Sequence, residues 1–542
     1  MLKKYFILLI ILIYAIISCS KMENSISNYN HSNKYYSLQI NIGEEPHIMD
    51  PSINVTSDTL IYLNHIFEGL VSKDKDGKII PAVAKSWNVS SDGLVYTFNL
   101  RDNAYWSDGN PVLAKDFVYS FRRLFDPKTK SKFAYQYSII KNSKEINKGE
   151  IESKYLGIEA IDDYTLEIVL DVPSTYFLEI LTSPTFYPLR NDIIKLNENN
   201  WTEKPETFIG NGPFKIVDRK LDNFIIMEKN TYYWNSNEII PSRLEFILKN
   251  DSLYSLNAVK KGVLHFSRHF PIEDIKELKD LGYIHDVPVI STYFYFINTT
   301  NKALSDINVR RALSLSIDRN YIVENITRAG EKPAAAFVPY GIYGFFGGFR
   351  ENGGNYIDIS EGNYKNDVKK AQRLMMLAGY PNGNGFPVIT FKTTHGRNRN
   401  IFEAIRKMWK ENLGINVEIE ELESADLSSE RFAKNFDIAS DNWNGDFNDP
   451  INFLSVFLSS SPNNNSLYSN KRYDDLIKTA TLITDTSHRM MTMHKAEELL
   501  MTDMPIIPIY FASEPILISP KLKGVQYDSM GQHNFYKAYL ED

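Results

Sequence analysis

Helix-forming and strand-forming segments alternate through the second half of this sequence, with glycine between them. Residues 366–378 and 400–412 each place apolar side chains at helical spacing, and Gly414 separates the second segment from a strand-like run at 415–419. Asp306 precedes another such segment, where an aspartate can cap the amino terminus of a helix. Repeated helix–glycine–strand units predict an α/β lobe built on a central sheet.

Strand and turn signals dominate the first half instead. Residues 38–42, 95–100 and 165–170 alternate or concentrate β-branched and aromatic side chains. Residues 115–124, between two of these runs, have the spacing of an amphipathic helix. A chain of 542 residues is too long for one hydrophobic core, so we expect two or three domains.

The amino terminus has the features of an export signal. Two lysines precede the apolar run 5–17, which is too short to span a bilayer. Cys19, the single cysteine of the chain, follows a small residue as in the lipobox of bacterial lipoproteins. We therefore expect a signal peptide over residues 1–18, lipidation of Cys19 and a polar flexible tether over residues 19–37. The alternative is an uncleaved anchor with an incidental thiol.

Composition and motif content exclude several functions. A net charge of −7 argues against a nucleic-acid partner, which requires a basic face. The sequence contains no P-loop, no HExxH and no CxxC motif, and its ten histidines show no paired ligand spacing. We therefore expect no enzyme activity, no metal and no cofactor. No segment after residue 17 approaches eighteen apolar residues, so we expect a soluble body without disulfides that depends on a large core.

A series of short motifs carries a family resemblance. In chain order these are MDP (49–51), FEGL (67–70), PAVAKSW (81–87), DGLVYTFNLR (92–101), WSDGNP (106–111), AKDFVYS (114–120), NGPF (211–214), DINVRRALSLSIDR (306–319), LAGYP (377–381), WKENLGINVEI (409–419) and YDDLI (473–477). Together they resemble the peptide-binding solute receptors of ABC importers, and the oligopeptide-binding proteins in particular. The resemblance runs from about residue 38 to the end of the chain.

The resemblance implies an α/β fold of the periplasmic-binding-protein type II class. Two lobes close over a ligand about a hinge, and an extra domain is inserted in the first lobe. Lobe I would comprise residues 38–66, 190–294 and 512–542, the inserted domain II residues 67–189 and lobe III residues 295–511. The chain would cross the hinge near residues 294 and 511.

The stretch SDNWNGDFNDP (440–450) follows a strand expected at 436–439 and combines acidic with aromatic residues. Asp449 before Pro450 fits the start of a helix, and Asp441 fits a solvated turn. Asp446 has no such local role. The resemblance implies that it holds the amino terminus of a bound peptide, because a buried ammonium group requires an anion beside it. The alternative is an exposed loop carboxylate.

Further binding residues follow from the same resemblance. Those expected to line the ligand are Val55, Thr56, Ser57, Phe133, Tyr293, Tyr295, Trp443, Asn444, Gly445 and Tyr510. Tyr293 and Tyr295 could equally belong to a packed core strand. Possible partners for a peptide carboxylate are Arg431, Arg397 and Arg399, each of which could instead be a surface charge. Ser424, Ser440 and Asn398 stand where relatives carry Trp, Arg and His, which leaves the preferred peptide length open.

The function that the sequence predicts is capture of oligopeptides by a monomeric, lipid-anchored extracytoplasmic receptor. It would deliver them to an ABC permease driven by separate ATPase subunits, because the chain has no ATP-binding motif of its own. Its place would be the cell membrane, on the periplasmic side in a two-membrane bacterium, or the cell surface. The alternatives are a receptor of the same fold for a non-peptide solute, such as a nickel chelate, haem or a sugar, and a surface adhesin or sensor on this scaffold.

Overall fold

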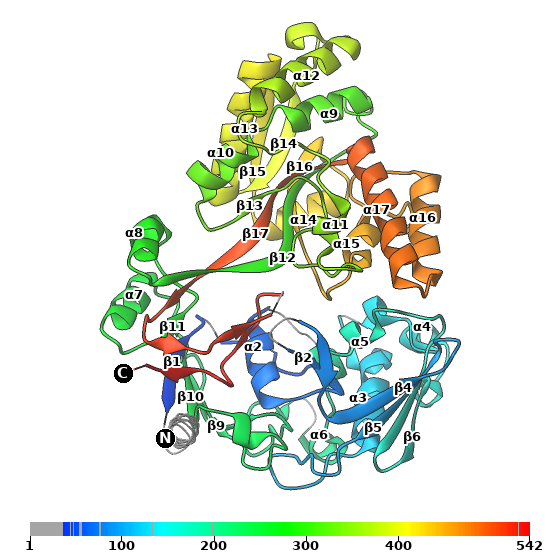
Figure 1. Cartoon of the computed structure of the whole chain (residues 1–542), viewed down its shortest axis with the longest axis vertical. Coiled ribbons are helices and arrows are strands. Elements are labelled where there is room, and N and C mark those ends of the chain that lie inside the picture. Colours follow the sequence, from blue (N-terminus) through cyan, green and yellow to red (C-terminus); the bar gives the residue numbers. More distant parts are fainter. Residues whose placement is uncertain are drawn as a thin grey trace, which may run out of the picture.

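The computed structural model describes residues 36–43, 45–46, 48–53, 57–74, 77–132, 134–197, 200–528 and 530–541. The expected signal peptide, Cys19 and the tether up to residue 35 lie outside this range. Figure 1 shows two bodies, one above the other, connected by the long strands β12 (Ile284–Ile297) and β17 (Ile506–Ile518). We call them the upper body, which contains residues 307–503, and the lower body.

One mixed sheet of eleven strands runs through both bodies, in the order β15-β14-β16-β12-β17-β11-β1-β10-β9-β8, with β13 paired to β17. The upper-body strands are β13 (Lys332–Pro333), β14 (Ile389–Thr394), β15 (Val417–Leu422) and β16 (Ile438–Asn444). The lower-body strands are β1 (Ser37–Asn41), β8 (Phe214–Lys220), β9 (Phe224–Lys229), β10 (Arg243–Ile247) and β11 (Phe266–Ser267). The antiparallel pairing of β12 with β17 shifts register between Pro288 and Thr292, where the chain passes from one body to the other.

Helices cover the upper part of the sheet on both faces. They are α9 (Ile307–Leu315), α10 (Arg319–Tyr321), followed by one π-helical stretch (Ile322–Thr327), α11 (Phe349–Gly353), α12 (Tyr364–Leu377), α13 (Arg397–Leu413), α14 (Ser424–Phe432), α15 (Ile451–Leu454), α16 (Lys471–Leu482) and α17 (Thr486–Asp503). Asp306 caps α9 through a hydrogen bond from the Asn308 amide, as its position in the sequence predicts. The helices predicted from residues 366 and 400 are α12 and α13.

Two hydrophobic clusters form the core of the upper body, one on each side of the sheet. Side chains alternate along β12, so Phe294 and Phe296 face one cluster while Tyr293 and Tyr295 face the other. Helix α13 closes the second cluster with Trp409, whose indole nitrogen donates to the Leu313 carbonyl at 2.9 Å. Both clusters are rich in aromatic side chains, and β12 packs between them.

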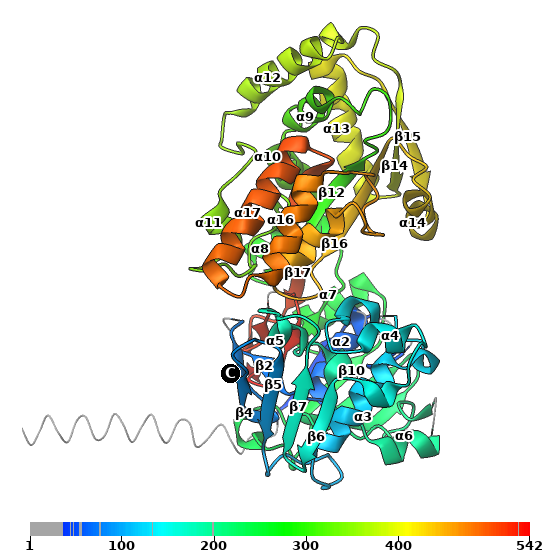
Figure 2. The same cartoon turned by 90° about the vertical axis from the view of Figure 1, so that its right-hand side faces the viewer.

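The lower body contains a second, antiparallel sheet with the order β4-β5-β7-β6, which Figure 2 shows at one side of this body. Its strands are β4 (Ala84–Val89), β5 (Val95–Leu100), β6 (Ile158–Asp162) and β7 (Thr165–Val169). Other lower-body elements are α2 (Ser57–Ile66), β2 (Val71–Lys73), β3 (Ile79–Pro81), α3 (Ala114–Phe125), α4 (Ser143–Asn147), α5 (Phe177–Ile180), α6 (Asn191–Asn197), α7 (Ser252–Lys260), α8 (Ile275–Asp280), β18 (Leu522–Lys523), β19 (Gln526–Tyr527), β20 (His533–Asn534) and β21 (Tyr539–Leu540). The second sheet lies within residues 67–189, and the domain boundaries themselves stay a prediction.

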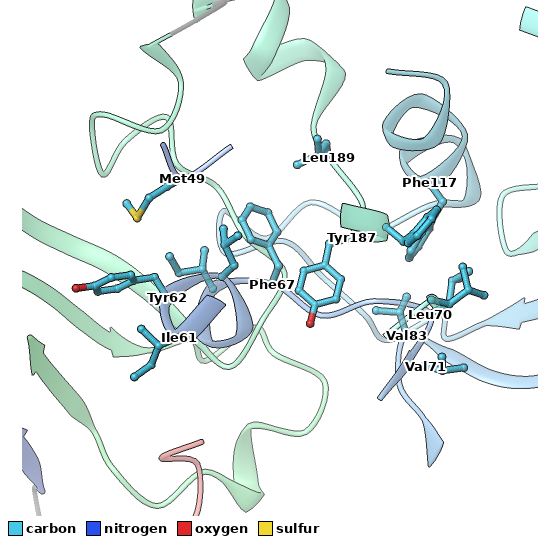
Figure 3. Packing of buried hydrophobic residues seen from close by; sticks show 14 of the residues in the cluster. Met49, Ile61, Tyr62, Phe67, Leu70, Val71, Val83, Phe117, Tyr187 and Leu189 are labelled. Carbon is cyan, nitrogen blue, oxygen red and sulfur yellow. The ribbon is translucent and has the colours of Figure 1, made fainter. Parts of the chain in front are cut away.

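The FEGL and NGPF motifs build the centre of the lower body. Figure 3 shows Phe67 beside the ring of Tyr187 in the buried cluster. The side chain of Asn211 accepts a hydrogen bond from the Glu68 amide at 3.0 Å and donates to the Glu68 carbonyl at 2.9 Å. The Glu68 carboxylate in turn accepts hydrogen bonds from Tyr233 and Trp234. These motif residues therefore satisfy buried polar groups of the core.

Candidate functional site

A cavity of about 620 Å³ lies where the two bodies meet. We call it the interbody cavity. The lower body contributes Leu60 and Asn64 from α2, residues 182–185, Arg268 and the turn between β19 and β20, while the upper body contributes residues 444–446 at the end of β16. The crossing strands supply Val289, Ile290, Ser291 and Glu514. A ligand in this cavity would touch both bodies at their connection.

Strand β16 extends further than the sequence suggested. Residues 438–444 pair with β12, from Ile438 opposite Ile297 to Asn444 opposite Ser291. The prediction that the strand ends at residue 439 was therefore wrong. The polar residues 440–444 form part of the strand because β12 supplies their hydrogen-bonding partners. The local sequence does not indicate that pairing. As a result, the acidic stretch begins within the sheet and reaches the interbody cavity at residues 444–446.

Gly445 fixes the position of the residue that follows it. Its amide donates to the Ile290 carbonyl at 2.8 Å. A Cβ atom on Gly445 would lie 2.6 Å from Cδ1 of Ile290, closer than carbon atoms can approach. A larger residue here would force the Ile290 side chain to move, and its Cβ would also lie 3.3 Å from the Ile290 carbonyl oxygen.

Asp446 is half-buried at the wall of the interbody cavity. Its backbone amide donates to Oδ1 of Asn452 at 3.3 Å, and its Oδ2 accepts a long hydrogen bond of 3.5 Å from Nδ2 of Asn452. In the described part of the chain no lysine, arginine or histidine forms an ion pair with Asp446. Burial raises the pKa of its carboxyl above the usual range. A partly buried carboxylate with one weak neutral partner is suited to a cationic ligand group.

The neighbours of Asp446 have structural partners. The indole nitrogen of Trp443 donates to Oδ1 of Asn452 at 3.1 Å, so Asn452 links Trp443 to Asp446. Phe447 stacks on Tyr176 of the lower body, with ring centroids 5.3 Å apart.

Asp449 forms a buried ion pair, because Arg489 donates to its two carboxylate oxygens at 2.7 and 2.8 Å. It also accepts from the Ile451 amide at 2.9 Å and so supports the start of α15, which begins one residue later than the sequence predicts, with Pro450 rather than Asp449 at the N-cap position.

Asp441 is not a solvated turn residue. It lies in β16 and forms an ion pair with Arg431 at 3.1 Å. Burial raises the pKa of Asp441 to about 6, against the favourable charge of Arg431. The turn interpretation fails for the same reason as the strand boundary, because β12 draws residues 440–444 into the sheet.

The aromatic residues expected to line the ligand lie elsewhere. Tyr295 is 0% exposed and packs against Phe391 and Phe402 in the core. Tyr293 stacks on Tyr510, opposite it in the sheet, with ring centroids 4.9 Å apart. None of these three tyrosines lines the interbody cavity, whereas Asn444 and Gly445 do. For Tyr293 and Tyr295 this is the packed strand that the sequence left open as an alternative, whereas no such alternative was considered for Tyr510.

The three arginines expected to bind a carboxylate have partners within the upper body. Arg431 donates to the Ser440 carbonyl at 2.8 Å in addition to its pairing with Asp441. Arg397 pairs with Glu331, and Arg399 pairs with Glu421 and Glu403. None of the three lines the interbody cavity.

A different cation borders the interbody cavity. Nε of Arg268 lies 2.7 Å from Oε1 of Glu514, and both side chains line the cavity. The pair forms because β11 and β17 are neighbours in the sheet. Sequence reasoning missed it, since 246 positions separate the two residues and neither belongs to a motif.

The remaining expected binding residues are described only in part. Val55, Thr56 and Phe133 lie outside the described residues, and Ser57 starts α2 with no described side chain. Leu60 and Asn64 of the same helix line the interbody cavity, so α2 contributes to its wall.

Within the described ranges no group of three or more His, Cys, Asp or Glu side chains is arranged to hold a metal ion. Across the same ranges no helix is both long and apolar enough to cross a membrane.

An α/β protein of two bodies, connected by crossing strands and with a cavity between them that charged and apolar side chains line, has the architecture of a solute receptor. The family model of the bacterial extracellular solute-binding proteins, family 5 (middle part), matches residues 78–465. The chain belongs to this family, which confirms the resemblance and the fold class predicted from the sequence motifs.

Relatives cover nearly the whole chain. The dipeptide-binding protein DppE of Bacillus subtilis is 32% identical over 524 residues, which are 96% of this chain and 95% of that protein. The murein tripeptide-binding protein MppA in its unliganded open form has a TM-score of 0.81 at 31% identity, covering 94% of this chain and 98% of that one. The oligopeptide-binding protein OppA of Haemophilus influenzae, in complex with the peptide RPPGFSPFR, has a TM-score of 0.74 at 29% identity, covering 94% of this chain and 100% of that one. These relatives are named as binding proteins, not as enzymes.

Proposed function

We propose that this chain is an extracytoplasmic receptor that captures oligopeptides and delivers them to an ABC permease. The observation that carries the proposal is the Asp446 carboxylate, which borders the interbody cavity without a cationic partner among the described residues. The one cation that every unmodified peptide shares is its terminal ammonium group. The names of the relatives as dipeptide- and oligopeptide-binding proteins support the same ligand class.

Ligand capture would proceed by closure of the two bodies about β12 and β17. The interbody cavity has walls from both bodies, so a ligand gains more contacts in the closed form than in the open form. This difference in affinity is what shifts the population toward closure. The likeness to an unliganded open form supports an open conformation of the present structure.

Attachment and energy supply belong to the same proposal. Cys19 would carry the lipid that holds the receptor at the membrane, and residues 19–37 would form a flexible tether between the lipid and the folded part of the chain. Transport energy would come from ATPase subunits that act on the permease, and the receptor would work as a monomer.

Mass spectrometry of the ligands that co-purify with residues 20–542 tests this proposal. The protein is isolated gently and then denatured, so that bound molecules are released. A ladder of short peptides is the expected result. If a single non-peptide solute is released instead, such as a nickel chelate, haem or a sugar, the ligand of the receptor belongs to that class and is not a peptide. A protein without any small ligand that also fails to bind added peptides would favour an adhesin or sensor.

A further inference from the structure

Asn452 lies beside the proposed anchor Asp446, although it does not line the interbody cavity. It belongs to the short helix α15 and is 7% exposed. None of the family motifs includes this position, so the sequence indicated no role for it. Its side chain is occupied by contacts within the protein, and these converge on Asp446.

Two donors fix the orientation of the Asn452 amide group. The indole nitrogen of Trp443 donates to its Oδ1 at 3.1 Å, and the Asp446 backbone amide donates to the same atom at 3.3 Å. Both groups can only donate, so the atom that receives them is the oxygen. The nitrogen, Nδ2, is therefore the end that meets the carboxylate, 3.5 Å from Oδ2 of Asp446. This orientation follows from the two shorter bonds and does not depend on the long one.

One oxygen of the Asp446 carboxylate thus has a donor of its own. Oδ2 accepts from the Asn452 amide, while Oδ1 accepts no hydrogen bond from the described part of the chain. An amide is neutral, so it orients the carboxylate without neutralising its charge, as a lysine or arginine would. An ionised carboxylate has about four acceptor positions, which leaves enough for the three donors of an ammonium group.

The position of Asn452 is set from two sides of the upper body. Trp443 lies in β16, opposite Thr292 of β12. The Asn452 backbone amide donates to the Asp449 carbonyl at 3.1 Å, where α15 begins. Asp449 is itself held by its buried ion pair with Arg489. The sheet and this ion pair therefore place Asn452 without any contribution from a ligand.

Asn452 also affects the charge of Asp446. Burial raises the pKa of the Asp446 carboxyl, and among the described residues the Asn452 side chain is the one group that lowers it. Asn452 therefore favours the ionised form, which a cationic ligand requires. The other charged or titratable groups of the surrounding elements are Asp449 with Arg489, Tyr176 and Glu179 at α5, and Tyr137, Arg268, Glu514 and Asp528 in the cavity wall.

We propose that Asn452 is a positioning residue for the Asp446 anchor: its amide group holds Oδ2, so that Oδ1 receives the terminal ammonium of the bound peptide. The inference rests on the proposed function and deepens it, because it names a residue outside the cavity that sets how tightly the amino terminus is held. Trp443 acts one step further back, since its indole fixes which end of the Asn452 amide meets Asp446.

Replacing Asn452 with leucine keeps a similar volume and removes the polar group. The Trp443 indole and the Asp446 amide would lose their acceptor, and Oδ2 would lose its donor. The carboxylate would then be free to turn, and its pKa would rise further. Hydrogen bonds to charged groups contribute about tenfold or more to affinity, so a loss of this size is expected for peptides with a free amino terminus.

The test is calorimetric titration of the intact chain with alanine peptides of two to five residues. The tightest binder is then compared with a free and with an acetylated amino terminus. In Asn452→Leu the free peptide should bind at least about tenfold more weakly, and the acetylated peptide should change by less than about threefold. Trp443→Phe should give a smaller loss with the same selectivity. Asn464→Leu is the matched control and should leave the ratio of the two affinities unchanged, because Asn464 is 5% exposed in the upper body and donates to the Leu458 and Tyr468 carbonyls instead.

The pH profile separates positioning from a purely structural role. Affinity for the free peptide should fall as the pH falls through the pKa of Asp446, because a neutral acid no longer attracts the ammonium group. In Asn452→Leu this fall should occur at a higher pH than in the wild type, by about half a pH unit or more. Asn452→Asp keeps an acceptor for both donors but places a second carboxylate beside Asp446, so its upward shift should be larger.

The outcomes distinguish the inference from the proposed function. Unchanged affinity in Asn452→Leu, or equal losses for the free and the acetylated peptide with a wild-type pH profile, would overturn the positioning role and leave peptide capture intact. If the wild type binds both peptides equally, Asp446 is not the anchor and the inference fails alone. If it binds no peptide at all, the proposed function fails and the inference with it. Should Asn452→Leu not fold, Asn452→Asp decides, because a wild-type pH profile in that variant contradicts the inference.

Discussion

The Gly445 amide donates a hydrogen bond of 2.8 Å to the Ile290 carbonyl, and a Cβ atom on Gly445 would collide with the present position of the Ile290 side chain. Ile290 lies where the pairing of β12 with β17 shifts register, and Gly445 precedes Asp446. The proposed ligand anchor is thus tied to the segment about which the two bodies would move. Ligand binding and closure are coupled at this contact if Asp446 is the anchor.

Substitution of Gly445 tests that relationship. Gly445→Ala should lower peptide affinity about tenfold, because the new Cβ meets Ile290 and displaces Asp446. Ile290→Ala in the same chain should restore part of the loss by making room. Titration of both variants with one peptide checks this, and wild-type affinity in Gly445→Ala would show that the contact does not position the anchor.

The buried pair of Asp449 and Arg489 should contribute to stability rather than to ligand binding. Arg489→Met leaves a buried carboxylate without its cation and should lower the free energy of unfolding by about 3–5 kcal/mol. Adding Asp449→Asn removes the unpaired charge and should recover much of this loss. Urea denaturation measures both variants.

An exposed pair supplies the control for that measurement. Lys471 and Asp475 lie 2.8 Å apart on the surface of α16, so Lys471→Ala should give no measurable change. If Lys471→Ala lowered the free energy of unfolding as much as Arg489→Met does, burial would not be the reason for the effect of Arg489→Met.

Asp441 should make stability depend on pH. Its pKa rises from 3.8 to about 6 on folding, so the folded chain binds more protons than the unfolded chain in this range. Its contribution is therefore favourable below about pH 4 and is lost as the pH rises through about 6, by up to about 3 kcal/mol at about 1.4 kcal/mol per pKa unit. The free energy of unfolding of the wild type, minus that of Asp441→Asn, should fall over this interval. A flat difference would show that Asp441 titrates normally.

The sequence predicts those elements of the fold whose caps and apolar periodicity lie within the element itself. The helices α9, α12 and α13 follow from caps and apolar periodicity within the segments themselves. Strand β16 could not be bounded in this way, because residues 440–444 are polar and pair only through β12. The family motifs FEGL and NGPF meet in the core, so they identify the fold without lining the interbody cavity.

The residues of the candidate site likewise divide into those that the sequence indicates and those that only long-range strand pairing brings together. Asp446 was predicted as a site residue because the resemblance to the oligopeptide receptors implied an anchor there and nothing in the local sequence indicated a structural role for Asp446. The alternation of Tyr293 and Tyr295 indicates that they share one face of β12, but not that α13 covers this face. Arg268, Glu514 and Asp528 meet the cavity only through the long-range pairing of strands and the return of the chain to the lower body, for which the sequence has no local signal.

The most direct test of the central claim combines a change in the protein with a change in the ligand. One peptide is titrated with a free and with an acetylated amino terminus against the wild type and Asp446→Asn. If Asp446 holds the terminal ammonium, acetylation should weaken wild-type binding about a hundredfold or more, and the variant by less than about threefold. Equal losses in both proteins would contradict the claim, because the ammonium would then be bound elsewhere.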